Sequence, residues 1–376
     1  MAPAPLKPSP LKPRLKPRLK PSHLKILYVG TLTQYDSALY RAWALERLGQ
    51  QVIPFDVTSQ KTGSLLGKIE FRLSAGPGVW QFNRDLLRAV EQHRPDVMWG
   101  DKLLYMQPST LKKLRSMGIA LVNYTIDNPF GPRKDPGWRL YMQCIPFYDL
   151  HIVQRDQNVL DYKQRGARDV LKIQTAYEPT LHFPPPPGWS DKDRNREVSF
   201  IGTPYDNRAD FLTRLWRDHG LPVVISGPLV WKDALSPETF QALYRGRGEL
   251  FLDAYREGIW RSKINLSFLT HSNQDEFTHK SFEIAGCGGF LLAERSPGHL
   301  QRFEEDKEAV FFSTLEECAA KIRRWLPDEA GRARIAAAGQ ARAQASGYHN
   351  DEQVRRILQR LESIMQEEKL RKEVLA

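Results

Sequence analysis

Residues 25–49, KILYVGTLTQYDSALYRAWALERLG, begin with a short apolar run and continue into an apolar pattern of helical period. The apolar run ends at Gly30, and the helical pattern ends at Gly49. Asp36 precedes the helical pattern, at a position where acidic and hydroxyl residues favour the start of a helix. The stretch therefore predicts a strand, a loop and a helix in that order.

The same alternation continues along the chain. The sequence predicts further helices around 86–90, at 108–117 and at 156–166, and further strands at 51–57, 96–99, 119–126, 150–153 and 169–175. Strands that alternate with helices form a parallel sheet with helices on both faces. Residues 24–181 are therefore predicted to form an α/β domain.

The alternation is interrupted at residues 182–197, which contain four consecutive prolines and then a polar stretch. Such a composition favours a linker between domains. Beyond it, strands are predicted at 198–202, 222–227, 263–268 and within 277–293, and a charged final helix is predicted at 351–376. Residues 198–350 are thus expected to form a second α/β domain. The chain length of 376 residues suits two domains, which would face each other across a cleft.

Positive charge is concentrated at one end of the chain. The formal net charge is +11, and residues 1–23 repeat Leu-Lys-Pro units without any acidic residue. This composition predicts a disordered basic tail, which is either a solubilising extension or a contact to an anionic membrane surface. A nucleic-acid partner is not expected, because the excess charge lies in the tail and no platform of aromatic and basic residues is visible.

The remaining composition indicates a cytoplasmic protein. The three cysteines, Cys144, Cys287 and Cys318, lack the spacing of metal ligands. No apolar run approaches the roughly 20 residues of a membrane-spanning helix, and the N-terminus has no signal-peptide pattern. Any membrane association is therefore expected to be peripheral, through the tail.

Binding chemistry is expected at residues 275–294, DEFTHKSFEIAGCGGFLLAE, which read as a loop, a short helix, a glycine turn and a buried strand. In parallel sheets, ligands bind beyond the carboxyl ends of the strands, where loop amides and helix N-termini face them. The amides of residues 278–281 suit a diphosphate, and Lys280 adds positive charge. Glu283, one turn further, suits hydrogen bonds from ribose hydroxyls.

This segment contains the spacing Asp275-x7-Glu283 and then, after Ile284, the run Ala-Gly-Cys-Gly-Gly-Phe-Leu-Leu. In this pattern the chain resembles retaining glycosyltransferases of the GT-B fold, which have two Rossmann-like domains. Within this fold it is most similar to the CgeB-type, spore-maturation-protein-like family. The likeness extends to 148–153, 198–204, 262–266 and 332–349. It implies transfer of a sugar from a nucleoside diphosphate sugar to an unidentified hydroxyl acceptor, with retention of configuration. It also implies that 24–181 is the acceptor domain and 198–350 the donor domain.

The resemblance and the residue pattern together name the candidate site. Glu283 would bind ribose, Gly202 and Thr203 would line the donor pocket, and the loop at 277–281 would bind the diphosphate or the donor sugar. The full set of candidate nucleotide-sugar ligands is Gly202, Thr203, Arg208, Lys263, Phe277, Thr278, His279, Ser281, Glu283, Gly288 and Gly289. Arg208 and Lys263 enter as cations able to reach a phosphate.

The candidate catalytic residues are Asp127, Asp275 and Lys280. Asp127 follows a predicted strand of the first domain and is suited to orient an acceptor hydroxyl or to act as a base. Two positions depart from the family pattern: Asp275 stands where the family has Glu, and Lys280 stands where it often has Arg.

No cofactor and no metal are predicted. Asp191-Lys-Asp193 resembles an Asp-x-Asp metal motif, but it lies in the polar linker without a preceding strand. Positive charge and the helix dipole would stabilise the leaving diphosphate instead. Two other functions stay open. The first is a catalytically silent binding or assembly protein, which the shorter side chain of Asp275 favours. The second is a nucleotide-sugar epimerase, which would need no acceptor.

Overall fold

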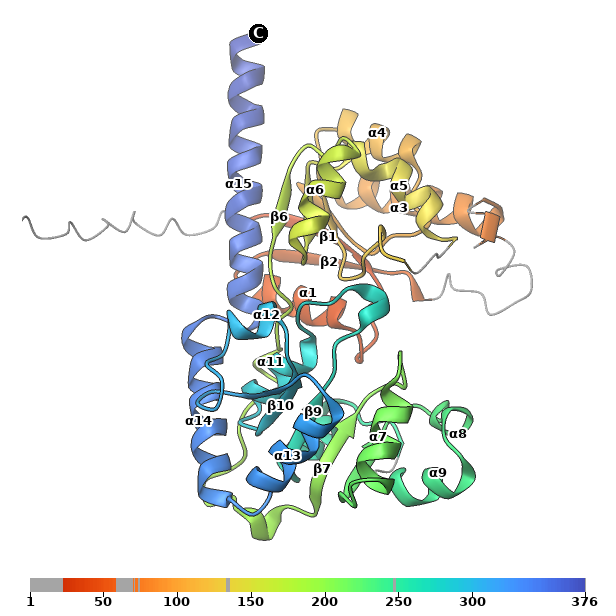
Figure 1. Ribbon diagram of the computed structural model, residues 1–376. Coiled ribbons are helices and arrows are strands. Elements are labelled where there is room, and N and C mark those ends of the chain that lie inside the picture. Colours follow the sequence, from red (N-terminus) through yellow and green to blue (C-terminus); the bar gives the residue numbers. More distant parts are fainter. Residues whose placement is uncertain are drawn as a thin grey trace, which may run out of the picture.

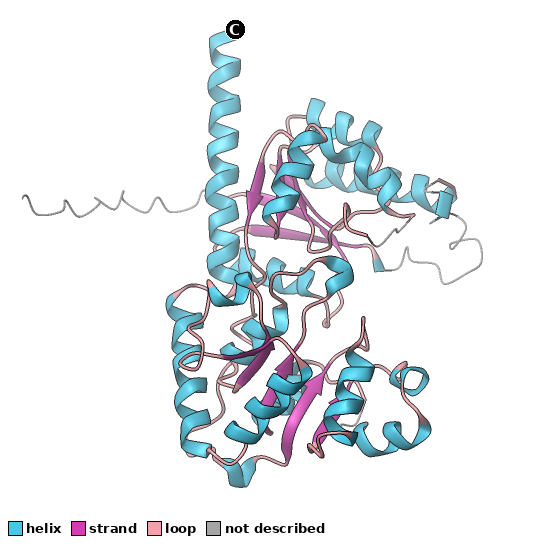
Figure 2. Ribbon diagram, in the orientation of Figure 1, coloured by secondary structure: helices cyan, strands magenta, loops and turns pink. Residues whose placement is uncertain are grey.

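The computed structural model describes residues 23–58, 70, 72–73, 75–132, 136–245 and 248–375. The predicted basic tail, apart from its last residue His23, lies outside these described residues. Figures 1 and 2 show two α/β bodies, one above the other, and a long helix beside them.

The N-terminal sheet has six strands, all paired in parallel, in the order β2-β1-β3-β4-β5-β6. The strands are β1 Lys25–Gly30, β2 Gln51–Asp56, β3 Val97–Asp101, β4 Ala120–Tyr124, β5 Leu150–Val153 and β6 Val170–Lys172. The connecting helices are α1 Ser37–Arg47, α3 Pro77–His93, α4 Pro108–Ser116, α5 Trp138–Cys144 and α6 Asp156–Gln164. The central strands β3, β4 and β5 are buried along their whole length, as expected for strands covered on both faces.

The C-terminal sheet has five parallel strands in the order β11-β10-β9-β7-β8. The strands are β7 Arg196–Ile201, β8 Val223–Ser226, β9 Ser262–Ser267, β10 Leu291–Glu294 and β11 Val310–Phe312. The helices are α7 Arg208–Arg217, α8 Trp231–Ala234, α9 Pro237–Leu243, α10 Leu252–Trp260, α11 His279–Gly286, α12 Pro297–Leu300, α13 Leu315–Trp325 and α14 Glu329–Ala345. Its core gathers apolar side chains from both faces of the sheet, as the alternation predicted.

The final helix, α15 Asn350–Leu375, returns to the N-terminal domain. Figure 1 shows it beside that domain, although it follows α14 of the other one. Val354, Ile357, Leu358 and Leu361 lie on one face of this helix and are buried in the core of the N-terminal sheet. The N-terminal domain is thus completed by the last residues of the chain.

The predicted elements occur in the predicted order, but the sequence prediction missed helix α5 and strand β11, which are too short to show a clear period. Other differences lie at element ends. The strand expected at 169–175 covers only Val170–Lys172, and the strand expected at 119–126 covers Ala120–Tyr124. Among the described residues, no helix combines the length and apolar character needed to cross a bilayer.

The two sheets turn their carboxyl ends toward each other. Tyr35, in the loop after β1, lies against Phe251 just before α10, with ring centroids 4.2 Å apart. After β4, the Asn128 amide donates to Asn273 Oδ1 at 2.9 Å, and its side-chain amide donates to Gln274 Oε1 at 2.8 Å. Asn273 and Gln274 follow β9, so the loops in which parallel sheets bind ligands meet at the junction of the two domains.

Candidate functional site

The N-terminus of α11 brings Lys280 against the loop that follows β7. A Cβ atom placed on Gly202 would lie 3.0 Å from Lys280 Cε, so the lysine side chain packs closely against this glycine. The Lys280 Nζ atom also lies 5.3 Å from the centre of the Tyr255 ring on α10. Lys280 is therefore held between the carboxyl end of β7 and α10.

Glu283 lies one turn after Lys280 on α11. Its carboxylate accepts a hydrogen bond of 2.6 Å from the hydroxyl of Tyr255. Burial acts to raise the pKa of Glu283, but attraction to the protonated forms of His182 and Lys280 outweighs it, and the pKa is lower than usual. The carboxylate is ionised and oriented, as an acceptor of hydroxyl hydrogen bonds requires.

Lys280 has an environment that favours an anionic ligand. Burial lowers its pKa, Glu283 opposes this effect, and Arg208 adds to it. A partly buried cation that lacks full compensation gains from a negatively charged partner. The N-terminal amides of α11 add a dipole of the same sign.

Arg208 is buried and organises the loops rather than opening toward a ligand. Its guanidinium donates to the carbonyl oxygens of Thr203, at 3.2 Å, and Leu269, at 3.0 Å, and to the Thr270 hydroxyl, at 3.0 Å. These bonds tie the loop after β7 to the loop after β9. Thr203 takes part through its backbone.

His279 and His182 lie near Glu283 and near residues of α1 in the N-terminal domain. Burial lowers the pKa of His279 to about 4, against the attraction of Glu283. His182 is buried, its ring centroid lies 5.8 Å from that of Tyr255, and burial lowers its pKa as well. Both imidazoles are therefore neutral near pH 7, and each can donate one hydrogen bond and accept another.

Asp275 is placed at the domain junction. Its carboxylate forms an ion pair with Arg155, which follows β5 of the other domain, and accepts a hydrogen bond of 2.8 Å from Asn273. Arg155 also donates to the carbonyl oxygens of Gln274, at 3.1 Å, and Ile126, at 2.9 Å. Asp275, the first acid of the predicted motif, thus helps to join the two domains.

Asp127 lies beside this junction, one residue before Asn128. Its carboxylate forms an ion pair with Lys102 and keeps 39% of its side-chain surface exposed. The structure therefore places an accessible carboxylate at the carboxyl edge of the N-terminal sheet, where the sequence predicted it.

Three other candidate residues, around the start of α11, contact neighbouring side chains of the same domain. Ser281 is fully buried and bonds Ser267, at 3.1 Å, and His299, at 2.8 Å. Thr278 is the residue that precedes α11, and its hydroxyl lies 3.2 Å from that of Ser267. Phe277 is buried, with the Arg302 guanidinium 4.0 Å from its ring centre.

Gly288, Gly289 and Lys263 are not brought together with Glu283. Gly288 has a φ of +64° in the turn after α11, where a Cβ would press on Pro184 at 3.2 Å. Gly289 packs against Ile259. Lys263 is the second residue of β9, at the opposite edge of the sheet, and it pairs with Glu197 at 3.9 Å. These three residues therefore make structural contacts away from Glu283.

The sequence prediction missed Tyr255, His182 and Arg155. Tyr255 lies in the first turn of α10, and no motif marks it. His182 lies at the start of the predicted linker, where a single histidine beside a proline run forms no motif. Arg155 directly follows a correctly predicted strand, so its position at a carboxyl edge was the available signal.

Metal ligands are not grouped in the part of the chain that the structure describes, where no three His, Cys, Asp or Glu side chains gather. Asp191, of the Asp-x-Asp sequence, forms ion pairs with Arg332 and with Arg194, the latter at 3.4 Å. The prediction that no metal is needed stays untested.

Comparison with known proteins gives one family match and several similar folds. Residues 208–359 match the family described as glycosyl transferase-like. No curated protein matches the chain. Three of the similar solved structures come from cyanobacteria and Burkholderia.

The Anabaena protein HepE in complex with UDP is 16% identical with a TM-score of 0.61, over 90% of this chain and 100% of that one. Sucrose-phosphate synthase of Thermosynechococcus elongatus is 12% identical with a TM-score of 0.60, over 93% and 99%. A UDP-forming trehalose-phosphate synthase of Burkholderia xenovorans is 12% identical with a TM-score of 0.62, over 91% and 99%.

These TM-scores establish a common fold, and they confirm the predicted arrangement of two Rossmann-like domains. The family match covers α7 to the middle of α15, which includes Lys280 and Glu283. Residues 208–359 therefore match a glycosyl transferase-like family, and the chain is a transferase with the GT-B fold.

Proposed function

We propose that the protein transfers a sugar from a nucleoside diphosphate sugar to a hydroxyl acceptor, with Lys280 binding the diphosphate and Glu283 the ribose. The observation that carries this proposal is the contact of Lys280 with Gly202, with Glu283 one turn away and oriented by Tyr255. A cation and a carboxylate at this spacing match the two polar parts of a nucleoside diphosphate.

UDP is the proposed nucleotide of the donor. Among the similar structures, the Anabaena protein is described in complexes with UDP and with UDP-glucose. The family proposed for the whole chain is the CgeB-type glycosyltransferases, on the residues of 275–293.

The proposed reaction retains the anomeric configuration and uses no metal. The bond from the anomeric carbon to the diphosphate breaks, a bond to the acceptor oxygen forms on the same face, and the hydroxyl proton passes to the departing phosphate. Lys280 and the N-terminal amides of α11 would stabilise the charge that develops on the diphosphate. The protein then acts mainly by alignment of the two substrates.

Asp127 is proposed to orient the acceptor hydroxyl. Its accessible carboxylate at the carboxyl edge of the N-terminal sheet supports this role. The ion pair with Lys102 gives the carboxylate a defined direction.

Peripheral contact with an anionic membrane surface is proposed for residues 1–23, on their basic composition alone. Sedimentation with vesicles that contain anionic lipid, with and without these residues, tests it. Equal sedimentation of both forms would leave the tail as a solubilising extension.

The function is tested by titration calorimetry with UDP and UDP-glucose, alongside the GDP, ADP and dTDP counterparts. We expect binding of one nucleotide class, and a loss of at least tenfold in affinity for both Glu283→Gln and Lys280→Met. Glu316→Gln and Lys307→Met, on the exposed surface of the same domain, are the matched controls. Unchanged affinity in both site variants would reject the proposed donor site.

A second candidate is a binding protein of the same fold without turnover. The specific observation in its favour is the engagement of Asp275 by Arg155, which removes the first acid of the motif from the donor sugar. Product analysis with UDP-glucose and a mixture of hydroxyl acceptors separates the two functions. Nucleotide binding without transfer or hydrolysis would favour the silent protein.

A further inference from the structure

A second polar cavity lies at the edge of the C-terminal sheet opposite to Glu283. It has a volume of about 920 Å³ and opens where β7 and β9 begin and just before β8. Pockets that hold small ligands have volumes of about 300–1,000 Å³. The cavity is therefore large enough for a metabolite, and it is separate from the proposed donor site.

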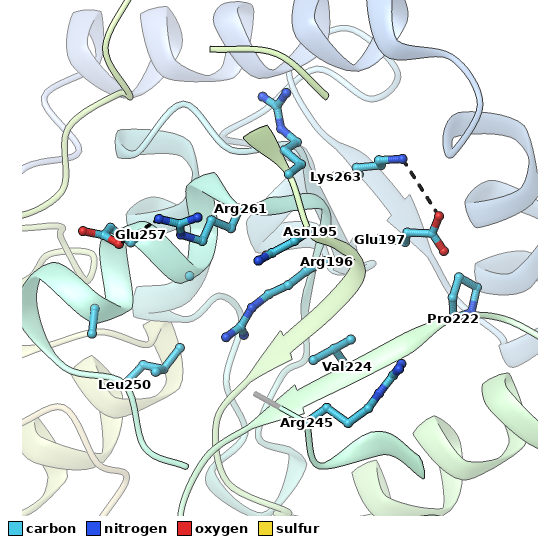
Figure 3. A pocket seen from close by; sticks show the side chains of 13 residues that line it. Asn195, Arg196, Glu197, Pro222, Val224, Arg245, Leu250, Glu257, Arg261 and Lys263 are labelled. Carbon is cyan, nitrogen blue, oxygen red and sulfur yellow. Dashed lines mark hydrogen bonds and ion pairs between the residues drawn. The ribbon is translucent and has the colours of Figure 1, made fainter. Parts of the chain in front are cut away.

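The walls of this cavity carry an excess of positive charge. They contain five cationic side chains and two carboxylates, Glu197 and Glu257. The cationic residues are Arg194, Arg196, Arg245, Arg261 and Lys263. Figure 3 shows Lys263 facing Glu197 and Arg261 facing Glu257. These are ion pairs of 3.9 and 3.4 Å, and the wall still holds three more cationic side chains than carboxylates.

The local carboxylates do not balance this excess. Arg245 is exposed and forms no ion pair with any residue that the structure describes. Asp191, which is not part of the cavity wall, is shared among Arg194, Lys263 and Arg332. Burial lowers the pKa of Arg194, Asp191 opposes this effect, and Arg332 adds to it. A bound anion would relieve this unfavourable grouping of cations.

The other wall residues indicate what accompanies the anionic group. Leu250, Ala254, Pro222 and Val224 give an apolar surface, and Glu257 is a hydrogen-bond acceptor for hydroxyl groups. The guanidinium groups match the geometry of phosphate oxygens. We propose that this cavity binds a phosphorylated, hydroxyl-rich small molecule. The cationic side chains of the wall would bind its phosphate, and Glu257 would accept hydrogen bonds from its hydroxyls.

Helix α10 connects this cavity to the donor site. Ala254, Glu257 and Gly258 line the cavity, whereas Tyr255, in the first turn of the same helix, donates to Glu283. A ligand that shifts α10 would move the Tyr255 hydroxyl with it. Coupling between two sites is reciprocal in binding free energy, so each ligand would change the affinity of the other by the same factor.

The test uses ribose 5-phosphate, ribose and inorganic phosphate as probes for the full chain, by titration calorimetry at low ionic strength. We expect ribose 5-phosphate to bind more tightly than phosphate, and ribose not to bind. The variants Arg245→Glu and Lys263→Ser should each weaken binding at least tenfold. Lys280→Met and the exposed Arg217→Ser should leave the affinity within twofold.

The same variants show which site is occupied. If Lys280→Met abolishes binding and Arg245→Glu does not, the probe occupies the donor site and the proposal is wrong. If no variant changes the affinity, or if no probe binds to wild-type protein, the cavity is not a phosphate site. Thermal unfolding without ligand checks that each variant is folded, and Arg245→Glu is expected to fold because its side chain is exposed.

Discussion

Arg155 and Asp275 form an ion pair that joins the N-terminal domain to the loop between β9 and α11. Only 6% of the arginine side chain and 12% of the aspartate side chain are exposed. The pair therefore lies in a region of low dielectric, where loss of one partner leaves the other charge uncompensated. It sets the position of the residues that lead into α11, and hence that of Lys280.

This ion pair should be visible in a double-mutant cycle. We expect Arg155→Gln and Asp275→Asn each to lower the free energy of unfolding by about 2–4 kcal/mol, because each leaves a buried charge. The double variant should lose clearly less than the sum of the two. Urea denaturation measures all four proteins. The exposed pair Arg217 and Asp218 provides the control cycle, in which little change is expected. Additive losses at the junction would show that the two charges do not interact.

Tyr255→Phe should weaken binding of the donor nucleotide. The variant removes the 2.6 Å hydrogen bond that orients Glu283, and we expect about a fivefold loss of affinity, the effect of one hydrogen bond. The pKa of Glu283 should also rise, because the hydroxyl is one of the groups that lower it. On acidification, the variant should therefore lose its affinity for the nucleotide at a higher pH than the wild-type protein does.

Calorimetry over pH 4–7 checks both effects. Tyr348→Phe, which loses a hydroxyl that donates to the Arg302 carbonyl at 3.0 Å, is the control for loss of a buried phenol group. The same pH profile for Tyr255→Phe and wild-type protein would contradict the orienting role.

Two buried histidines should make the fold sensitive to acid. Burial lowers the pKa of His151 and of His299 to about 4. Because the unfolded chain binds protons at these sites near pH 6.5 and the folded chain does not, stability falls as the pH drops from 6.5 toward 4. Each histidine should cost about 2 kcal/mol at pH 5 relative to pH 7. Asp149, whose pKa burial raises to about 6, acts in the opposite direction, since its folded form takes up a proton first.

The measurement is the slope of unfolding free energy against pH, compared between wild-type protein and His299→Gln. His299 is fully buried between the Glu294 carbonyl, at 2.8 Å, and Ser281, so the variant is expected to be less stable at pH 7. Its slope between pH 5 and 7 should nevertheless be smaller. An unchanged slope would show that His299 does not resist protonation.

The C-terminal helix should contribute to the stability of the N-terminal domain through its first half. Leu358 is fully buried against the N-terminal sheet, and Leu358→Ala should cost about 2–4 kcal/mol because it leaves a cavity. Leu370, on the same helix, is 60% exposed, and Leu370→Ala should change the free energy of unfolding by less than about 0.5 kcal/mol. Hydrogen exchange of β1 and β3 amides should increase in Leu358→Ala alone. Equal effects of the two substitutions would contradict the packing.

The order of strands and helices could be predicted because each element carries its own period. The apolar run at 25–30 and the helical pattern after it correspond to β1 and α1, and the same holds for β2, β5 and β7. The ends of β4 and β6 were predicted less accurately. Hydrogen bonds to a neighbouring strand decide where a strand ends, and a local pattern carries no information on that neighbour.

The sequence by itself determined two α/β domains, a linker between them, and a segment around Glu283 with the composition of a nucleotide site. These follow from the spacing of apolar residues and from local composition, which any window of the chain displays. The tertiary structure alone decided that α15 completes the N-terminal domain, that Asp275 pairs with Arg155, and that Tyr255 orients Glu283. Each of these contacts joins residues far apart in the chain or on different elements, so it exists only once the sheets have formed and brought their carboxyl edges together.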